Sequence, residues 1–167
     1  VEGYETWVNV PLELSDDVAD VGQRLEPSLE SIAALEPDLI LTSEGRHEPI
    51  YEALADIAPT LMIPADVPND DTPPIEATYA HFRLIAEALG RAEAAETVIA
   101  EVGQTIADGA AAVEEAGKAG APYVVVQAFT SENVPTMRIF SDDSLIGQTI
   151  TSLGLENVWQ GTGDAYG

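Results

Sequence analysis

Two basic positions are candidates for ligand chemistry in a chain that is otherwise strongly acidic. Arg24 comes just before a helix–strand unit at residues 27–43, and Arg46 with His47 comes just after its strand. A guanidinium group can donate two parallel hydrogen bonds to the oxygens of a chelate without competing for the metal. Ligands of open α/β sheets bind beyond the carboxyl ends of the strands. We therefore expect a ligand at the loop that carries Arg46 and His47.

Plainer roles for these residues stay open on position alone. The two arginines could form surface ion pairs with Glu26, Glu44 or Glu48, and such pairs contribute little to stability. His47 is either a ligand contact or an ordinary loop residue. His81 lies within a helical pattern, and we expect it to be structural.

The composition limits the class of protein. The 167 residues include 30 acidic residues against 6 Lys and Arg, a formal charge of -24, and 46% are hydrophobic. A globular chain with this charge repels phosphate backbones and anionic membrane surfaces, so we expect no nucleic-acid partner and no direct membrane contact. Cys is absent and the two His are far apart, so we expect no direct metal site and no cofactor.

The elements that must position the arginines begin with a helix and a strand. Pro27 suits the first turn of a helix, and Pro37 ends that helix by pushing Glu36 out of the α region. Residues 39–41 are a short apolar run, typical of a strand buried on both faces. Proline thus defines both ends of the predicted helix.

A second helix and strand follow in the same order. Pro49 opens the helix, Pro59 ends it, and residues 61–63 form the strand. Alternation of helix and strand predicts parallel strands with crossover helices. Residues 75–113 then keep helical spacing, and Gly90 could pause or kink that helix.

A second α/β piece begins at Pro122. Residues 123–126 and 137–140 are expected to be strands, and residues 141–144 offer N-cap candidates for a helix that ends at Gly154. Asp142 and Asp143, within this cap segment, fit the start of a helix better than a Ca²⁺ site. The Gly-rich end of the chain is not a dinucleotide fingerprint, because it neither follows a clear strand nor opens a helix.

The plan is therefore α/β, with lobes at residues 1–74 and 121–167 joined by a stiff helical bridge at residues 75–120. Each lobe shows about two clear strands, whereas a typical sheet has about five or six. We expect a fragment that is incomplete at both ends.

The chain resembles the substrate-binding proteins of ABC importers for ferric siderophores, haem and vitamin B12. The matching residues are Val21-Gly22, Pro27-Ser28-Leu29-Glu30, Ile32-Ala33-Ala34-Leu35, Pro37-Asp38-Leu39-Ile40-Leu41, Ile57-Ala58-Pro59-Thr60 and Leu153-Gly154-Leu155 through Trp159-Gln160-Gly161. The resemblance implies two Rossmann-like lobes bridged by a long α-helix, the class III periplasmic-binding-protein fold. It also implies a receptor, not an enzyme, that captures a ferric siderophore between the lobes for delivery to a membrane permease.

The hydroxamate-siderophore branch of this family is the most similar. Arg24 matches an Arg that faces the iron-bound oxygens, whereas Arg46 replaces a Tyr, with one extra residue in the loop. A second Arg suits a more anionic ligand such as ferric citrate. Tyr166 falls at the place of a ligand-stacking aromatic, although as Tyr and not Trp. Trp159 belongs to the core or to the rim of the cleft, and Glu30 matches a permease-docking Glu.

The resemblance also implies a location outside the cytoplasm. The family's export signal and lipid-anchored Cys would lie upstream of this sequence, so any membrane attachment would be through that anchor. Haem, cobalamin and ferric citrate remain alternative ligands. An α/β enzyme acting on a small anion is the weaker alternative, because no Gly-x-Ser-x-Gly elbow, phosphate loop or ligand-spaced His pair is found.

Overall fold

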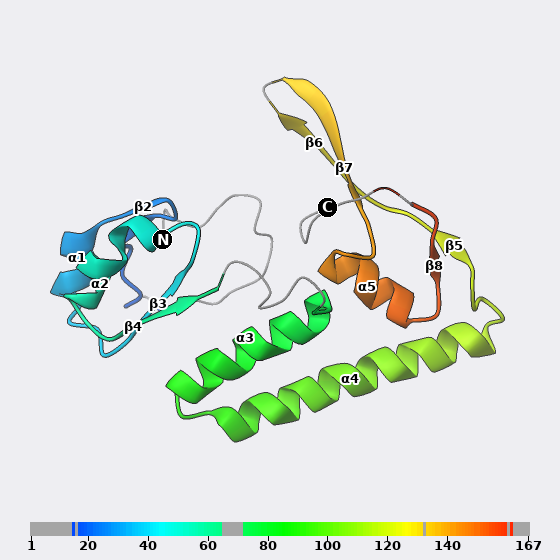
Figure 1. Cartoon of the computed structure of the whole chain (residues 1–167), viewed down its shortest axis with the longest axis horizontal. Coiled ribbons are helices and arrows are strands. Elements are labelled where there is room, and N and C mark those ends of the chain that lie inside the picture. Colours follow the sequence, from blue (N-terminus) through cyan, green and yellow to red (C-terminus); the bar gives the residue numbers. More distant parts are fainter. Residues whose placement is uncertain (1–14, 16, 65–71, 132, 160, 162–167) are drawn as a thin grey trace. The chain divides into compact units, whose positions relative to one another are not determined.

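The computed structural model describes residues 15, 17–64, 72–131, 133–159 and 161. The chain separates into two compact units, residues 1–66 and 67–167, and each is described by itself (Figure 1). The predicted limits of the two lobes and the helical bridge remain a prediction.

The described part of unit 1 contains a short antiparallel hairpin that the sequence did not predict. Strand β1 (Gly22–Gln23) pairs with β2 (Glu26–Pro27), so Arg24 and Leu25 form the two-residue turn. Gly22 has a φ of 100°, a conformation that L side chains rarely adopt. The hairpin places Arg24 at its tip.

Helix α1 (Leu29–Ala34) begins two residues later than the sequence indicated. Ser28 is its N-cap, because its Oγ accepts a hydrogen bond from the Ser31 amide at 3.1 Å. Pro27 was wrongly placed in the helix, since it pairs in β2. Glu36 lies outside the right-handed α region, as predicted, but its φ of 47° is left-handed and not the extended conformation usual before a proline.

The helix–strand alternation of unit 1 is confirmed. Strand β3 (Ile40–Ser43) pairs in parallel with β4 (Thr60–Ile63). The crossover between them holds the 3₁₀ turn η1 (Glu48–Ile50) and helix α2 (Tyr51–Ala55). The loop after β3 therefore leaves from the carboxyl end of a parallel strand.

The core of unit 1 lies around α2 and the residues that follow it. Leu54 is 2% exposed and Ala58 is 7% exposed. Leu41 is 43% exposed, so the prediction of a strand buried on both faces is wrong for this residue. The neighbouring Thr42, whose side chain points to the opposite face, is buried instead.

Unit 2 begins with a helical hairpin, not a single stiff helix. Helix α3 (Pro74–Ala88) and helix α4 (Ala92–Glu115) lie side by side and run in opposite directions (Figure 1). Gly90 takes a φ of 65°, and its left-handed backbone reverses the chain where a kink was expected. The buried side chains of Ala86 and Ala95 are small.

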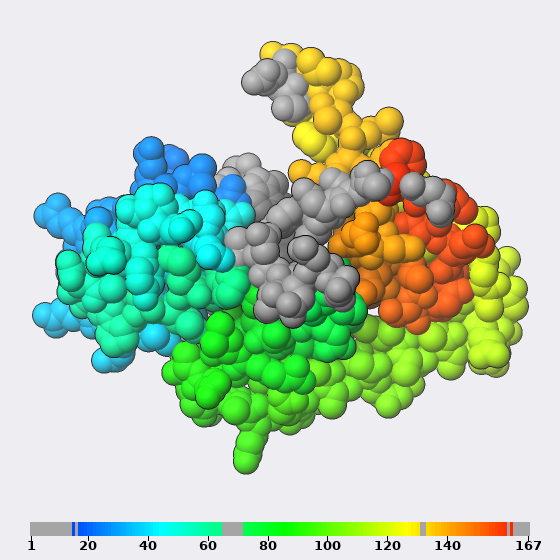
Figure 2. All heavy atoms as spheres, in the orientation of Figure 1, coloured from blue at the N-terminus to red at the C-terminus, as the bar shows by residue number. Residues whose placement is uncertain are grey.

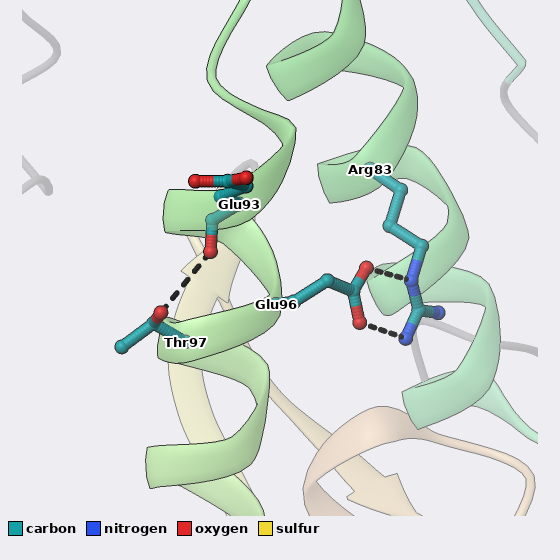
Figure 3. A network of polar contacts seen from close by, with 4 residues as sticks. All are labelled: Arg83, Glu93, Glu96 and Thr97. Atoms are coloured by element: carbon teal, nitrogen blue, oxygen red, sulfur yellow. Dashed lines mark hydrogen bonds and ion pairs between the residues drawn. The ribbon is translucent and has the colours of Figure 1, made fainter.

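An ion pair links the two helices of this hairpin (Figure 3). The Arg83 guanidinium donates to both carboxylate oxygens of Glu96, at 2.7 and 3.1 Å. These hydrogen bonds raise the pKa of Arg83 and lower the pKa of Glu96. Both side chains are about half exposed, so water weakens the pair.

The remaining strands of unit 2 differ from the predicted pair. Strand β5 (Pro122–Tyr123) pairs in parallel with β8 (Glu156–Asn157). Strands β6 (Val125–Ser131) and β7 (Val134–Phe140) form an antiparallel hairpin, the yellow projection in Figure 2. The predicted strand at residues 123–126 is thus divided between two sheets, because the chain leaves the first sheet at Val124.

Helix α5 (Leu145–Ser152) is capped as the sequence indicated. The Ser144 Oγ accepts a hydrogen bond from the Gly147 amide at 3.1 Å, and Gly154 follows the helix with a φ of 84°. The Gln148 side chain accepts a hydrogen bond from the Ile75 amide at 2.8 Å, which ties α5 to the start of α3.

Candidate functional site

The site is built from the turn of the first hairpin and the loop after β3, both in unit 1. Arg24 is exposed at the turn, and Arg46 is exposed in the loop. Gly45, just before Arg46, has a φ of 75°, and the Ser43 carbonyl oxygen accepts from the His47 amide at 3.2 Å. The Arg46 Nη1 lies 3.5 Å from the Ser43 Oγ. A compact turn therefore carries Arg46 at the carboxyl end of β3.

His47 connects the two segments. Its Nε2 lies 2.7 Å from the carbonyl oxygen of Arg24, and its Nδ1 lies 2.6 Å from the Thr42 Oγ1. A carbonyl oxygen can only accept, so Nε2 carries the hydrogen, and in the neutral ring Nδ1 accepts from the Thr42 hydroxyl. Both ring nitrogens of His47 are thus engaged within the protein.

A hollow of about 360 Å³ lies against this arrangement. Its polar members include the side chains of Gln23, Arg24, Thr42 and His47. The apolar lining is formed by Val21, Pro27, Ile32, Leu35, Pro37, Leu39, Ile40, Leu41 and Leu54. The arginine turn therefore stands at the edge of a largely apolar depression.

The other predicted site residues lie elsewhere. Glu30 is exposed in the first turn of α1, where the helix dipole favours a carboxylate. Trp159 belongs to unit 2 and is 40% exposed; its amide donates to the Asn157 Oδ1 at 3.1 Å. Tyr166 lies outside the described residues. The structure thus brings together the Arg24 turn, His47 and the Arg46 loop.

Thr42 is the residue of this site that the sequence reasoning missed. It is 7% exposed, and its hydroxyl is bonded to His47. A polar residue directly after the apolar run at residues 39–41 was the available signal, because a buried hydroxyl needs a partner.

Within the described part of the chain, no group of three or more His, Cys, Asp or Glu side chains could hold a metal ion. In the same residues, no helix combines the length and the apolar character needed to cross a membrane.

Two relatives of this chain are named as binding proteins for iron complexes. Fe(3+)-citrate-binding protein YfmC of Bacillus subtilis is 38% identical over 98 residues, which are 56% of this chain and 28% of the relative. Iron(3+)-hydroxamate-binding protein FhuD of Escherichia coli is 29% identical over 98% of this chain. The aligned part is 52% of FhuD, so the chain spans about half the length of that relative.

A solved structure confirms the fold. FhuD from Vibrio cholerae, a siderophore-binding protein solved with Fe3+-Desferal, matches with a TM-score of 0.77 at 24% identity. The match covers 93% of this chain and 56% of the solved one. Because the identity is low, the match shows the fold alone. That fold is the class III α/β architecture that the resemblance implied.

The family model described as periplasmic binding protein matches residues 1–167, the whole chain. The predicted location outside the cytoplasm is that of this family. From its sequence and its fold alike, the chain belongs to the periplasmic binding protein family.

Proposed function

We propose that this chain is part of the substrate-binding component of an ABC importer that captures a ferric siderophore for iron uptake. The observation that carries the proposal is the placement of Arg24. Arg24 lies on a turn whose backbone is hydrogen-bonded to His47. His47 belongs to the Arg46 loop, which follows the carboxyl end of the parallel strand β3. The names of the relatives support an iron complex as the ligand. The proposal assigns no catalytic step to this chain.

Arginine suits this ligand for a physical reason. A ferric siderophore presents oxygen atoms with negative charge, and guanidinium groups donate to such oxygens while leaving iron coordination to the chelator. The iron thus arrives already chelated and is cargo, not a cofactor.

Ferric citrate is the second candidate ligand, and Arg46 favours it. A second exposed cation near the Arg24 turn suits a ligand with more negative charge than a ferric hydroxamate. The B. subtilis relative named as a ferric-citrate-binding protein supports the same choice. Haem and cobalamin have no comparable observation in their favour.

Delivery to a permease is a further part of the proposal. Glu30 is exposed at the start of α1, where it is available to pair with an arginine on another protein. Any lipid anchor would belong to a segment outside this sequence. Trp159 and Tyr166 are retained as proposed ligand contacts.

The test is a titration with a ferric hydroxamate siderophore and with ferric citrate, followed by Trp fluorescence. The chain has two Trp, and iron-free siderophore and iron-free citrate are the controls. We expect saturable quenching by one ferric complex only, which also identifies the ligand class. A folded sample that responds to neither complex would contradict the proposal.

Arg24→Ala is the matching variant. Loss of a charge-assisted hydrogen bond should weaken binding by about tenfold or more. Arg91→Ala is the matched control, because Arg91 is also exposed but lies at the start of α4 in unit 2, where its side chain makes no capping hydrogen bond. Equal losses in the two variants would show that general charge, and not the site, governs binding.

A further inference from the structure

We infer that His47 is a positioning residue that holds the Arg24 turn in its ligand-binding geometry and does not itself contact the ligand. The inference rests on the proposed function, in which Arg24 meets the ligand. The sequence left two roles open for His47, a ligand contact or an ordinary loop residue, and the inference assigns it neither.

The hairpin that carries Arg24 is too short to hold its own shape. Each strand has two residues, and an isolated two-stranded hairpin is marginally stable in water. Arg24 and Leu25 are both exposed, so little packing restrains the turn. A hydrogen bond from another part of the fold therefore has a large effect on where this turn lies.

His47 supplies such a bond from 23 residues away in the sequence. Its Nε2–H donates to the backbone carbonyl of Arg24, and this hydrogen bond does not involve the Arg24 guanidinium. The restraint thus fixes the backbone that presents the charge without using the charge itself.

The ring is itself held by a more rigid element. Thr42 is buried in β3, and its hydroxyl is 2.6 Å from the His47 Nδ1. The connection therefore runs from the parallel sheet through Thr42 and the imidazole to the turn. With both nitrogens occupied, the ring has no remaining nitrogen to offer a ligand.

Two substitutions separate the two ring contacts. The amide of Asn reaches the position of Nδ1, so His47→Asn keeps a partner for Thr42 and loses the bond to Arg24. The longer Gln places its amide nitrogen near Nε2, so His47→Gln can donate to the Arg24 carbonyl. Gln should rescue the turn, and Asn should not.

The measurements are affinity for the ferric complex and backbone hydrogen exchange. For His47→Asn we expect exchange in residues 21–28 about fivefold faster and affinity about fivefold lower, the size of one net hydrogen bond. Exchange in residues 40–63 and in α4 should not change. His47→Gln should lie between His47→Asn and the wild type in both measurements, because Gln restores the donor to Arg24 and not the partner of Thr42.

Four results would overturn the inference. Three of them are unchanged exchange in residues 21–28 of His47→Asn, an unchanged affinity despite faster exchange, and equal behaviour of the Asn and Gln variants. Faster exchange throughout residues 40–63 would also overturn it, by making His47 a folding residue. If the wild type binds no ferric complex, the proposed function fails, while the exchange data still decide whether His47 holds the turn.

Discussion

His47 in unit 1 and Asp142 in unit 2 each form hydrogen bonds between segments that are distant in the sequence. The two residues differ in the burial of the groups that they bind. The Asp142 Oδ1 accepts from the Thr151 hydroxyl at 2.9 Å and from the Asn157 amide nitrogen at 3.2 Å. Asn157 is 4% exposed. The His47 bond ends instead on the backbone of an exposed turn.

This difference separates binding from stability. A lost bond to a buried amide such as Asn157 removes one of its partners where water does not replace it, and the unit loses stability. A lost bond to an exposed turn is replaced by water, and the main consequence is a turn that moves more. We therefore expect changes around Asp142 to affect unfolding and changes at His47 to affect the ligand.

The largest expected effect comes from Gly147→Ala, which creates a steric overlap close to Asp142. A Cβ added at Gly147 would lie 2.0 Å from the Ser141 carbonyl oxygen. Gly147→Ala should destabilise unit 2 by about 3 kcal/mol or more, measured by denaturant unfolding. Gly103→Ala in α4 is the control, since a Cβ at Gly103 would have no other atom within 4 Å and alanine favours helix. Similar stability of both variants would contradict the steric argument.

Asp142→Ala tests the comparison directly. Asn157 is buried, so removal of the carboxylate takes one acceptor from its amide, whereas water replaces the bond at the exposed Thr151. We expect the free energy of unfolding to fall by about 1 kcal/mol. Asp142→Asn retains an acceptor oxygen and should lose less. The fluorescence response to the ferric complex should keep its affinity in any variant that remains folded. A selective loss of affinity at wild-type stability would reverse the roles assigned to Asp142 and His47.

The pH dependence of unfolding tests the contribution of Tyr123 to the stability of the same region. Burial raises the pKa of Tyr123, and its hydroxyl donates to the Gly147 carbonyl oxygen at 2.8 Å. A raised pKa gives stability that is present below the unfolded pKa, about 10, and is lost as pH rises through the folded pKa. Tyr123→Phe should lose about 1 kcal/mol at neutral pH and show a weaker decline at alkaline pH. Parallel alkaline curves for both proteins would rule out this contribution.

The smallest expected effect concerns the Arg83–Glu96 pair of the helical hairpin. Hydrogen bonding to Arg83 lowers the pKa of Glu96, so the pair stabilises above the unfolded carboxyl pKa and is lost as pH falls through the folded one. Glu96→Gln should change the melting temperature slightly at neutral pH and not at acid pH. Glu101→Gln, exposed on the same helix, is the control. A larger change in melting temperature at acid pH than at neutral pH would show that the Arg83–Glu96 ion pair does not stabilise the hairpin.

The parts of the fold that the sequence predicted depend on local chemistry. Pro37 and Pro59 restrict their own backbone and that of the preceding residue, so they mark the ends of α1 and α2 wherever those helices pack. The parallel pair of β3 and β4 followed from the order of elements. The helix ends hold because each is decided within a few residues, whereas the strand pair joins distant residues such as Ile40 and Thr60.

The missed parts were either too short for a periodic pattern or dependent on distant partners. Two-residue strands such as Glu156–Asn157 carry no alternation that could reveal them. Gly90 was expected to kink a helix, because its sequence context does not say whether the next helix will fold back on the first. That choice depends on packing between α3 and α4.

The amino-acid sequence alone was enough to specify the family, the helix ends marked by Pro37 and Pro59, and the presence of two arginines on either side of one helix–strand unit. The link that His47 makes between the Arg24 turn and the Arg46 loop emerged only from the folded chain. The reason is the short range of a hydrogen bond, here 2.7 Å between atoms of residues 23 positions apart. Whether two such atoms reach that distance depends on how the intervening helix and strand fold, and no local pattern contains that information.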